Sequence, residues 1–233
     1  MEKDLKSYRE IELRYYVIGN ILLMTLLTGL FPTINTPDIS SNIKLVNELL
    51  TTAIVSSIIY VYIFLMDSLV PPKFKQYAVF FPNGIMPGAT VFTKIKNKTV
   101  DVRFTPEDAK KRYAKEYAEL DIISDTKLQQ AKENSLWYRI YIHHENEEKI
   151  RRIQHDSLLC RDIFISTIWL GLIVIALYLL GIFPINKKCI IVLGTELVFT
   201  NIAARVKAKR FVYTVIAQDV HSKIVEAEKE HIK

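Results

Sequence analysis

The stretch Ile163-Phe-Ile-Ser-Thr-Ile-Trp-Leu-Gly-Leu-Ile-Val-Ile-Ala-Leu-Tyr-Leu-Leu-Gly-Ile-Phe183 decides the class of this protein, because it contains 21 consecutive residues without a charge. A helix needs about 17–25 such residues to cross the hydrocarbon core of a bilayer. The sequence therefore predicts a membrane-spanning helix here. The overall composition is less informative, since 50% apolar and 24% charged residues also occur in soluble domains.

Three further blocks are apolar over a similar length: Tyr15–Phe31, Leu49–Met66 and Cys189–Val206. The last block is interrupted by Glu196, Asn201 and Arg205, and it follows the Ile163–Phe183 block after a five-residue link that suits a tight turn between antiparallel spans. We therefore predict an α-helical membrane protein with four transmembrane helices. A three-span alternative remains open because the last block is the weakest.

The Lys and Arg residues that flank these blocks predict the topology, since basic residues concentrate on the cytoplasmic side. The loop of residues 32–43 has none, whereas basic residues follow the second block, precede the third and follow the fourth. The first block is followed by Phe31-Pro-Thr-Ile, which is not a cleavage site, so we interpret it as a retained anchor. We expect a multi-pass protein of the bacterial inner membrane with both termini and the central segment in the cytoplasm.

The segment of residues 67–162 is long and patterned enough to fold, and we predict a cytoplasmic α+β insert between spans two and three. Residues 75–81, 91–95 and 98–104 have strand composition or alternation. Helices are predicted from Thr105-Pro106 to Leu120, from Ser124 or Asp125 through Tyr141, and from Glu145 to Arg161. The predicted organisation is residues 1–66, with a tail and two spans; 67–162, the insert; 163–206, two spans; and 207–233, a helical tail.

The tail repeats apolar residues at helical spacing from Phe211 to Val225, so we read span four and the tail as one long helix. An apolar stripe in water needs a partner. The sequence leaves two partners open, the insert or further copies of the chain.

One pattern could indicate catalysis: Arg139 and His144 form an R-x4-H motif of the kind found in HEPN ribonucleases, in which His acts as general acid or base and Arg binds phosphate. The surrounding Trp137, Tyr138 and Tyr141 are more typical of a packing face. His143 or His144 with His155 and Cys160 match no established metal-ligand spacing. We expect no enzyme activity, no cofactor and no metal.

The polar residues inside the predicted spans are the better indication of function, since such residues usually face a bundle interior or a water-filled path. Glu196 is the clearest example. Pore-lining candidates on the two polar spans are Glu196, Thr200, Thr195, Asn201, Glu48, Thr52 and Ser56. Rings of Glu from several copies would favour cations. The alternative is a single Glu hydrogen-bonded within the bundle.

Basic residues gather in the central segment, on the proposed strands and on the helix that follows them. The candidates for binding an anionic nucleotide or DNA oligomer are Lys94, Lys96, Lys98, Arg103, Lys110 and Arg112. Contact with anionic lipid headgroups would also account for them.

Several short motifs resemble bacterial membrane proteins of anti-phage defence loci: Pro87-Gly88, Val91-Phe92, Asp101-Val-Arg-Phe104, Asn134-Ser-Leu-Trp-Tyr138 and His155-Asp-Ser-Leu-Leu-Cys-Arg-Asp162. The similarity is to the Hailong type of membrane effector, with the Kiwa membrane subunit as a second candidate. The resemblance to Hailong implies a homo-oligomeric channel that DNA oligomers, made by a partner nucleotidyltransferase, hold closed. It transfers no site residues.

We therefore expect a homo-oligomer, such as a tetramer, that forms a ligand-gated, cation-conducting channel in anti-phage defence. Its expected partners are further copies of itself, the lipid bilayer, an anionic nucleotide or DNA oligomer, and a soluble protein encoded nearby. Two alternatives stay open: a non-conducting membrane anchor for a soluble defence partner, and a membrane-tethered HEPN-like ribonuclease.

Overall fold

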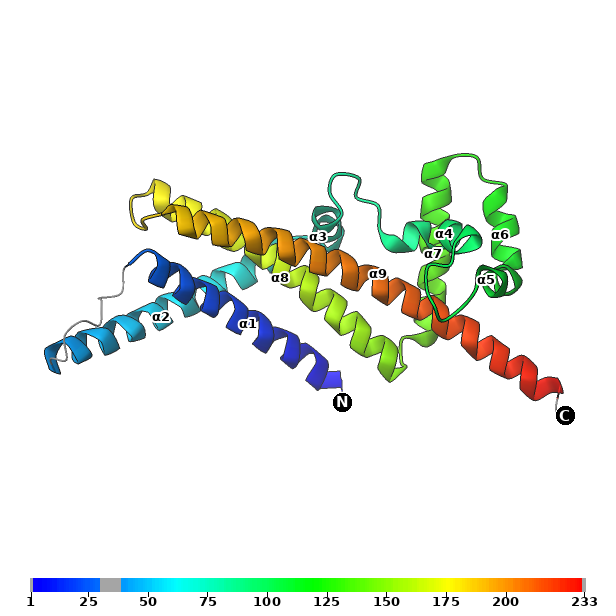
Figure 1. The fold of residues 1–233 in the computed structure, drawn as a ribbon, viewed down its shortest axis with the longest axis horizontal. Coiled ribbons are helices and arrows are strands. Elements are labelled where there is room, and N and C mark those ends of the chain that lie inside the picture. Colours follow the sequence, from blue (N-terminus) through cyan, green and yellow to red (C-terminus); the bar gives the residue numbers. More distant parts are fainter. Residues whose placement is uncertain (1, 30–38, 232–233) are drawn as a thin grey trace. The chain divides into compact units, whose positions relative to one another are not determined.

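The computed structural model describes the backbone of residues 2–29 and 39–231, and the side chains of residues 11–29, 46, 47 and 50–222. Every regular element in these ranges is a helix (Figure 1). The elements are α1 (Glu2–Leu27), α2 (Ile39–Leu69), α3 (Pro72–Val79), η1 (Pro87–Thr90), α4 (Val91–Asn97), α5 (Pro106–Arg112), α6 (Ala114–Asp121), α7 (Thr126–His144), α8 (Glu148–Leu179) and α9 (Lys187–His231).

The chain divides into two compact units, which we call unit 1 (Met1–Lys75 and Leu159–Ala204) and unit 2 (Gln76–Leu158 and Arg205–Lys233). Helices α8 and α9 each run without a break from one unit into the other. The predicted long helix through span four and the tail is therefore confirmed as α9. The helix predicted from Glu145 begins at Glu148 and continues into the third span.

Three helical segments of the described chain are long and apolar enough to cross a membrane: Leu50–Leu69, Glu148–Leu179 and Lys187–Ser222. The prediction of four spans is therefore wrong. The block that drops out is the first, not the fourth that the sequence marked as weak. Helix α1 ends at Leu27 and carries Glu10, Glu12 and Arg14, so its uncharged helical part is shorter than the roughly 17 residues a crossing needs.

Unit 1 holds its own apolar core, in which α1, α2 and α8 meet. Val17 and Ile21 of α1 pack with Ile63 of α2 and with Leu170 and Val174 of α8. Thus α1 packs in the same core as two of the candidate spans. Many other apolar side chains of α2, α8 and α9 are exposed in the isolated chain, as expected for helices that face lipid.

The predicted α+β insert is also wrong, because no strand forms in the described residues. Residues 75–81 belong largely to α3, which starts at Pro72, and residues 91–95 belong to α4. Val91, Phe92 and Ile95 are all fully buried, so helical spacing rather than alternation brings them to the core. In residues 98–104 the alternation fails, because Val102 is 99% exposed while Phe104 is buried. Strand composition was overridden by packing.

Two of the predicted helix starts in unit 2 are confirmed. Thr105 caps α5 and forms a capping box with Asp108, and Asp125 caps α7 by accepting hydrogen bonds from the first-turn backbone. The helix expected to reach Leu120 is interrupted at Tyr113, where α5 ends and α6 begins.

The core of unit 2 answers the question of what covers the apolar stripe of the tail. Val212, Ile216 and Val220 of α9 are buried in one cluster with residues of α4, α5, α6 and α7, including Phe92 and Tyr113. The partner of the stripe is therefore the insert of the same chain.

A buried carboxylate organises the junction between α4 and α7. Glu133 of α7 is 1% exposed and accepts hydrogen bonds from the Phe92 and Thr93 backbone amides at 2.9 and 3.2 Å, and from the Thr93 hydroxyl. These are amides at the start of α4, which lack partners within the helix. Nearby, a side chain at Gly88 would meet the Asn134 side chain and the Trp137 ring, so glycine there allows the close approach of η1 to α7.

We predict that the stability of the Glu133→Gln variant, compared with that of wild type at the same pH, increases as pH rises. Burial raises the pKa of Glu133 above its ordinary value of 4.5. A raised folded pKa stabilises the fold below the unfolded pKa, and that contribution is lost as pH rises through the folded pKa. Gln keeps the shape and an acceptor oxygen but has no such pH dependence. Thermal unfolding in detergent between about pH 4.5 and 7 measures the difference; a difference independent of pH contradicts the prediction.

Candidate functional site

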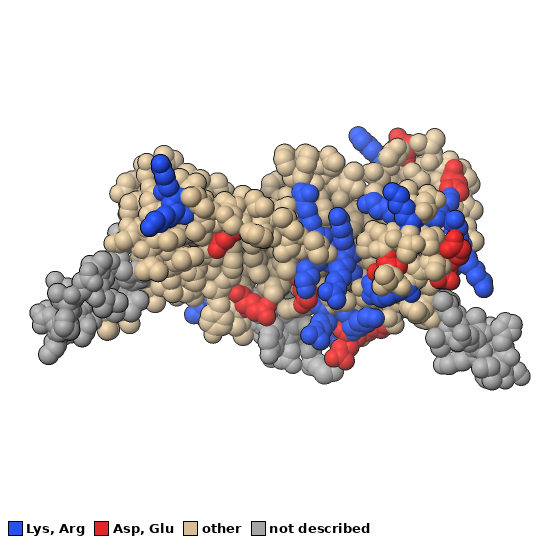
Figure 2. Space-filling model, in the orientation of Figure 1, with Lys and Arg blue, Asp and Glu red and all other residues tan. Residues whose placement is uncertain are grey.

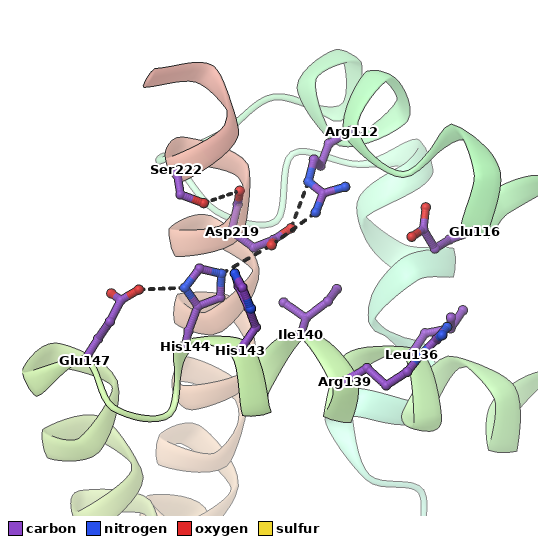
Figure 3. A pocket seen from close by; sticks show the side chains of 10 residues that line it. All are labelled: Arg112, Glu116, Leu136, Arg139, Ile140, His143, His144, Glu147, Asp219 and Ser222. Atoms are coloured by element: carbon purple, nitrogen blue, oxygen red, sulfur yellow. Dashed lines mark hydrogen bonds and ion pairs between the residues drawn. The ribbon is translucent and has the colours of Figure 1, made fainter. Parts of the chain in front are cut away.

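A polar pocket with a volume of about 600 Å³ opens in unit 2 (Figure 3). Helix α7 contributes one of its faces, and the other walls come from α5, α6, α9 and the link before α8. The lining residues are Arg112, Glu116, Leu136, Arg139, Ile140, His143, His144, Glu147, Asp219 and Ser222. The volume lies within the range of roughly 300–1,000 Å³ that is usual for small-molecule sites.

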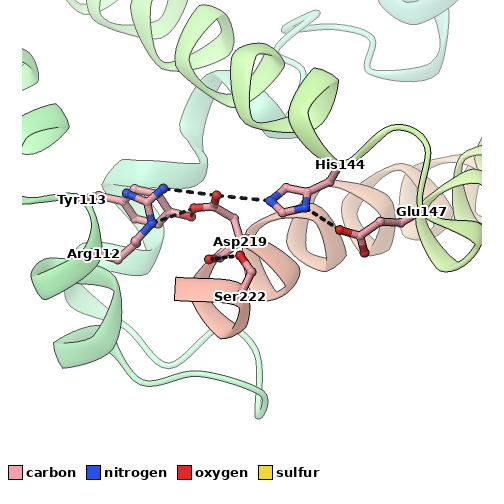
Figure 4. Close-up of polar contacts among 6 residues, drawn as sticks. All are labelled: Arg112, Tyr113, His144, Glu147, Asp219 and Ser222. Atoms are coloured by element: carbon pink, nitrogen blue, oxygen red, sulfur yellow. Dashed lines mark hydrogen bonds and ion pairs between the residues drawn. The ribbon is translucent and has the colours of Figure 1, made fainter. Parts of the chain in front are cut away.

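Asp219 of α9 is the centre of the polar contacts in this pocket (Figure 4). Its side chain is 4% exposed. Arg112 contacts it with Nε at 3.0 Å, the Tyr113 hydroxyl donates to it at 2.8 Å, and His144 Nε2 lies at 3.2 Å. Burial, together with the Asp219 carboxylate, raises the pKa of Tyr113 well above its ordinary value, so this hydroxyl stays a proton donor.

His144 is held between two carboxylates. Its Nδ1 lies 2.6 Å from Glu147 Oε1, and its Nε2 faces Asp219 Oδ1. Both ring nitrogens of His144 are therefore engaged by carboxylates of the same chain. A histidine used in this way has no free nitrogen with which to take a proton from a substrate.

The other half of the R-x4-H motif is differently placed. Arg139 and His143 line the pocket with exposed side chains, and the apolar floor beneath them is Leu136 and Ile140. Arg139 is the cationic side chain in the pocket with the greatest access to a ligand, and His143 is exposed beside it, whereas Arg112 is already paired with Asp219. The pocket could therefore hold a small molecule that combines an anionic group with an apolar part.

Half of the basic residues expected to bind an anionic ligand are engaged in contacts within the protein. Lys96 pairs with Asp121 at 2.7 Å, Arg103 pairs with Asp101 and donates to Thr214 of α9, and Arg112 pairs with Asp219. The Arg103 guanidinium lowers the pKa of Asp101. The remaining candidates, Lys94, Lys98 and Lys110, are exposed. On the face in view, several Lys and Arg side chains gather near the middle of the picture with Asp and Glu at the edge of the group, and the two signs mix toward the right (Figure 2).

The pore-lining candidates lie in different surroundings. Glu196 is half-buried in unit 1, where the Tyr16 hydroxyl lies 3.5 Å from its Oε2. The hydroxyls of Thr200 and Ser56 donate to the backbone one turn earlier, to Glu196 O and Thr52 O respectively, and Thr195 is exposed. Asn201 and Thr52 are partly buried, and the side chain of Glu48 lies outside the described residues.

The sequence reasoning missed the residues that surround these groups. Tyr16 and Asn20 of α1 were passed over inside an apolar block, although their four-residue spacing puts both on one helix face. Asp219 lies within the apolar stripe of the tail and was not singled out there. No group of three or more His, Cys, Asp and Glu in the described part of the chain is arranged to hold a metal ion.

We predict that Asp219→Ala destabilises unit 2 by about 3–5 kcal/mol, because it leaves the buried ends of Arg112 and His144 without their carboxylate. The matched control is Asp156→Ala, which breaks a more exposed pair with Lys207 and should cost about 1 kcal/mol or less. Chemical denaturation of the purified proteins measures both. Equal losses in the free energy of unfolding would contradict the prediction, because the buried contacts of Asp219 would then stabilise unit 2 no more than the exposed pair of Asp156 and Lys207.

Comparison with known proteins supplies no identity for this fold or this site. No family model, no curated protein and no solved structure matches the chain.

Proposed function

We propose that the protein crosses the bacterial inner membrane with α2, α8 and α9, and that unit 2 lies in the cytoplasm. The distribution of Lys and Arg supports a cytoplasmic position for unit 2. Unit 2 contains both the insert that precedes α8 and the tail that follows the apolar part of α9, which supports a hairpin of these two helices across the membrane. The expectation that both termini share a side required an even number of spans, so it does not follow from three spans.

Reporter fusions after Lys111 and Lys233 should give the same cytoplasmic signal; opposite signals would contradict the hairpin.

Within this topology, we propose that several copies assemble into a cation-conducting channel controlled by unit 2. The observation that best supports the channel proposal is that α9 carries polar residues of both the apolar span and the pocket. This single helix carries Glu196 in its apolar part and, further along, Asp219 and Ser222 in the wall of the polar pocket. A ligand in the pocket therefore contacts the helix that carries the intramembrane carboxylate.

Glu196 suits such a role because a charge inside a span is costly and is kept where it meets water, ions or polar partners. Glu196 is partly buried within its own chain, and Thr195 beside it is exposed. Other copies could meet this face of α9. A ring of carboxylates formed in this way would favour cations over anions.

The controlling ligand is proposed to be an anionic nucleotide or DNA oligomer, and the biological role to be anti-phage defence. The resemblance to Hailong-type effectors is the argument for both. The pocket offers this ligand a site in which Arg139 and His143 are accessible. This site differs from the group of basic residues predicted from the sequence, because Arg112 is the member of that group that lines the pocket.

The scaffold alternative has an observation of its own. Unit 2 exposes Val102, Ile122 and Leu128 at 99%, 84% and 64%, and exposed apolar side chains can contact a soluble partner. The nuclease alternative is less well supported, because both ring nitrogens of His144 face carboxylates.

We predict that purified wild-type protein carries cation current in planar bilayers, and that Glu196→Gln lowers it. Gln keeps the shape of the side chain but removes the negative charge that would attract cations. Asn47→Ala, an exposed change on α2, serves as a control that should leave the current unchanged. If wild-type protein carries no current with or without nucleotides and DNA oligomers, the channel proposal is wrong and the scaffold replaces it.

A further inference from the structure

The short helix α3 and the turn after it expose a row of aromatic side chains directly after α2. Phe74, Tyr77 and Phe81 are 60%, 47% and 62% exposed. They follow one another at spacings of three and four residues, so they gather on one side of the segment. Lys75 and Val79, which share another face of α3, are buried. The segment therefore presents an aromatic face, made of Phe74, Tyr77 and Phe81, away from its buried face.

The aromatic face is fixed by contacts within the turn. The Tyr77 hydroxyl donates to Pro82 O at 3.2 Å, and the Tyr77 and Phe81 rings meet edge to face with their centroids 6.2 Å apart. Gly84 has a φ of +62°, and a side chain there would collide with the Tyr77 ring. Glycine thus allows the turn to close against Tyr77. The exposed rings belong to an ordered turn that holds them in place.

Arg205 of α9 closes the other end of α3. Its Nε donates to Val79 O at 2.8 Å and its Nη2 donates to Phe81 O at 2.7 Å. The end of a helix leaves such carbonyls without partners inside the helix. Both acceptors are uncharged, so these contacts do not cancel the positive charge of Arg205. Lys73, in the first turn of α3, is exposed. A positive charge therefore lies near each end of the aromatic face.

Two contacts set the depth of this segment relative to the apolar helices. Lys75 Nζ pairs with Asp67 Oδ2 at 2.6 Å, so the first turn of α3 lies beside the last turn of α2. Arg205 is the first basic residue of α9 after Lys188, so it marks the end of the apolar run of that helix. Thus α3 contacts the ends of two apolar runs. In a bilayer, this is where the hydrocarbon core meets a headgroup layer of about 5–8 Å.

We propose that the aromatic face binds the lipid of the cytoplasmic leaflet, with its three rings among the upper acyl chains and with Lys73 and Arg205 at anionic headgroups. Aromatic side chains are favoured at this depth, because the ring is apolar and the Tyr hydroxyl is polar. Helices with aromatic residues on one face and basic residues beside them lie in the plane of the interface. The proposal rests on α2 crossing the membrane, but it does not depend on conduction.

Tryptophan fluorescence of the full-length protein in vesicles tests the proposal, with lipids that carry bromine on the upper acyl chain as quenchers. Phe74→Trp and Phe81→Trp put reporters on the aromatic face, and Ile58→Trp puts one at an exposed position within α2. The emission that each adds to that of wild type should be quenched. Val102→Trp, at a position of unit 2 that is 99% exposed, is the control and should not be quenched.

The headgroup contacts have a measurement of their own. Quenching of Phe81→Trp is titrated with brominated lipid that is either anionic or zwitterionic, and the ratio of the two apparent affinities is compared between variants. Lys73→Gln should lower the preference for anionic lipid by about fivefold, because one basic residue near an anionic surface has an effect of this size. Lys127→Gln, at an exposed position of α7, should leave the preference unchanged. An unchanged preference in Lys73→Gln would contradict the headgroup contact.

Two further results would overturn the proposal. If Phe74→Trp and Phe81→Trp stay unquenched while Ile58→Trp is quenched, the aromatic face lies in water or against another protein, although α2 still crosses the membrane. If Val102→Trp is quenched as strongly as Phe81→Trp, contact with lipid is not a property of this face. An unquenched Ile58→Trp would contradict the span itself. The Phe-to-Trp changes replace one exposed ring by another, so the fold should be kept.

Discussion

The fold of unit 2 depends on the hydrogen bonds and the ion pair of the Asp219 carboxylate. It lies on α9, the last helix of the chain, and it is contacted by Arg112 and Tyr113 of the insert and by His144 at the end of α7. A buried carboxylate is stable only with such partners, which supply the hydrogen bonds and positive charge that water would otherwise provide. The tail and the insert thus specify each other, and the apolar stripe around Asp219 is buried in the same contact.

A second buried carboxylate has the same function on a smaller scale. Glu133 joins α7 to the start of α4 through backbone amides that no turn of helix could satisfy. Glu196, in unit 1, differs from both, since its contact with the Tyr16 hydroxyl is long, at 3.5 Å, and its proposed role is in conduction rather than in holding the fold.

The sequence predicted what local patterns determine. The capped start at Thr105 and Pro106, the helix beginning at Asp125 and the long helix through span four and the tail all follow from short-range signals. The strands were mispredicted because Val91, Phe92 and Ile95 have strand composition, while Glu133, 41 residues away from Phe92, supplies the cap that makes a helix there. A span was wrongly predicted at Tyr15–Phe31 because the sequence does not show where α1 ends.

The candidate site was predictable only in part. The R-x4-H motif drew attention to Arg139 and His144, which do line the pocket, but nothing in their spacing shows that Glu147 and Asp219 occupy both nitrogens of His144. Glu196 was found from its cost in a span. Its neighbours Tyr16 and Asn20 lie on another helix, and contacts between helices distant in sequence cannot be read from one chain.

The central claim is that α9 connects the pocket of unit 2 to conduction through the membrane. Cation flux into vesicles containing purified protein tests it most directly, with Ser222→Trp to fill the pocket from α9 and Ser135→Trp, at an exposed position of α7, as the matched control. The account predicts that the flux of Ser222→Trp differs from that of wild type while Ser135→Trp matches it. Equal flux through all three proteins would contradict the connection.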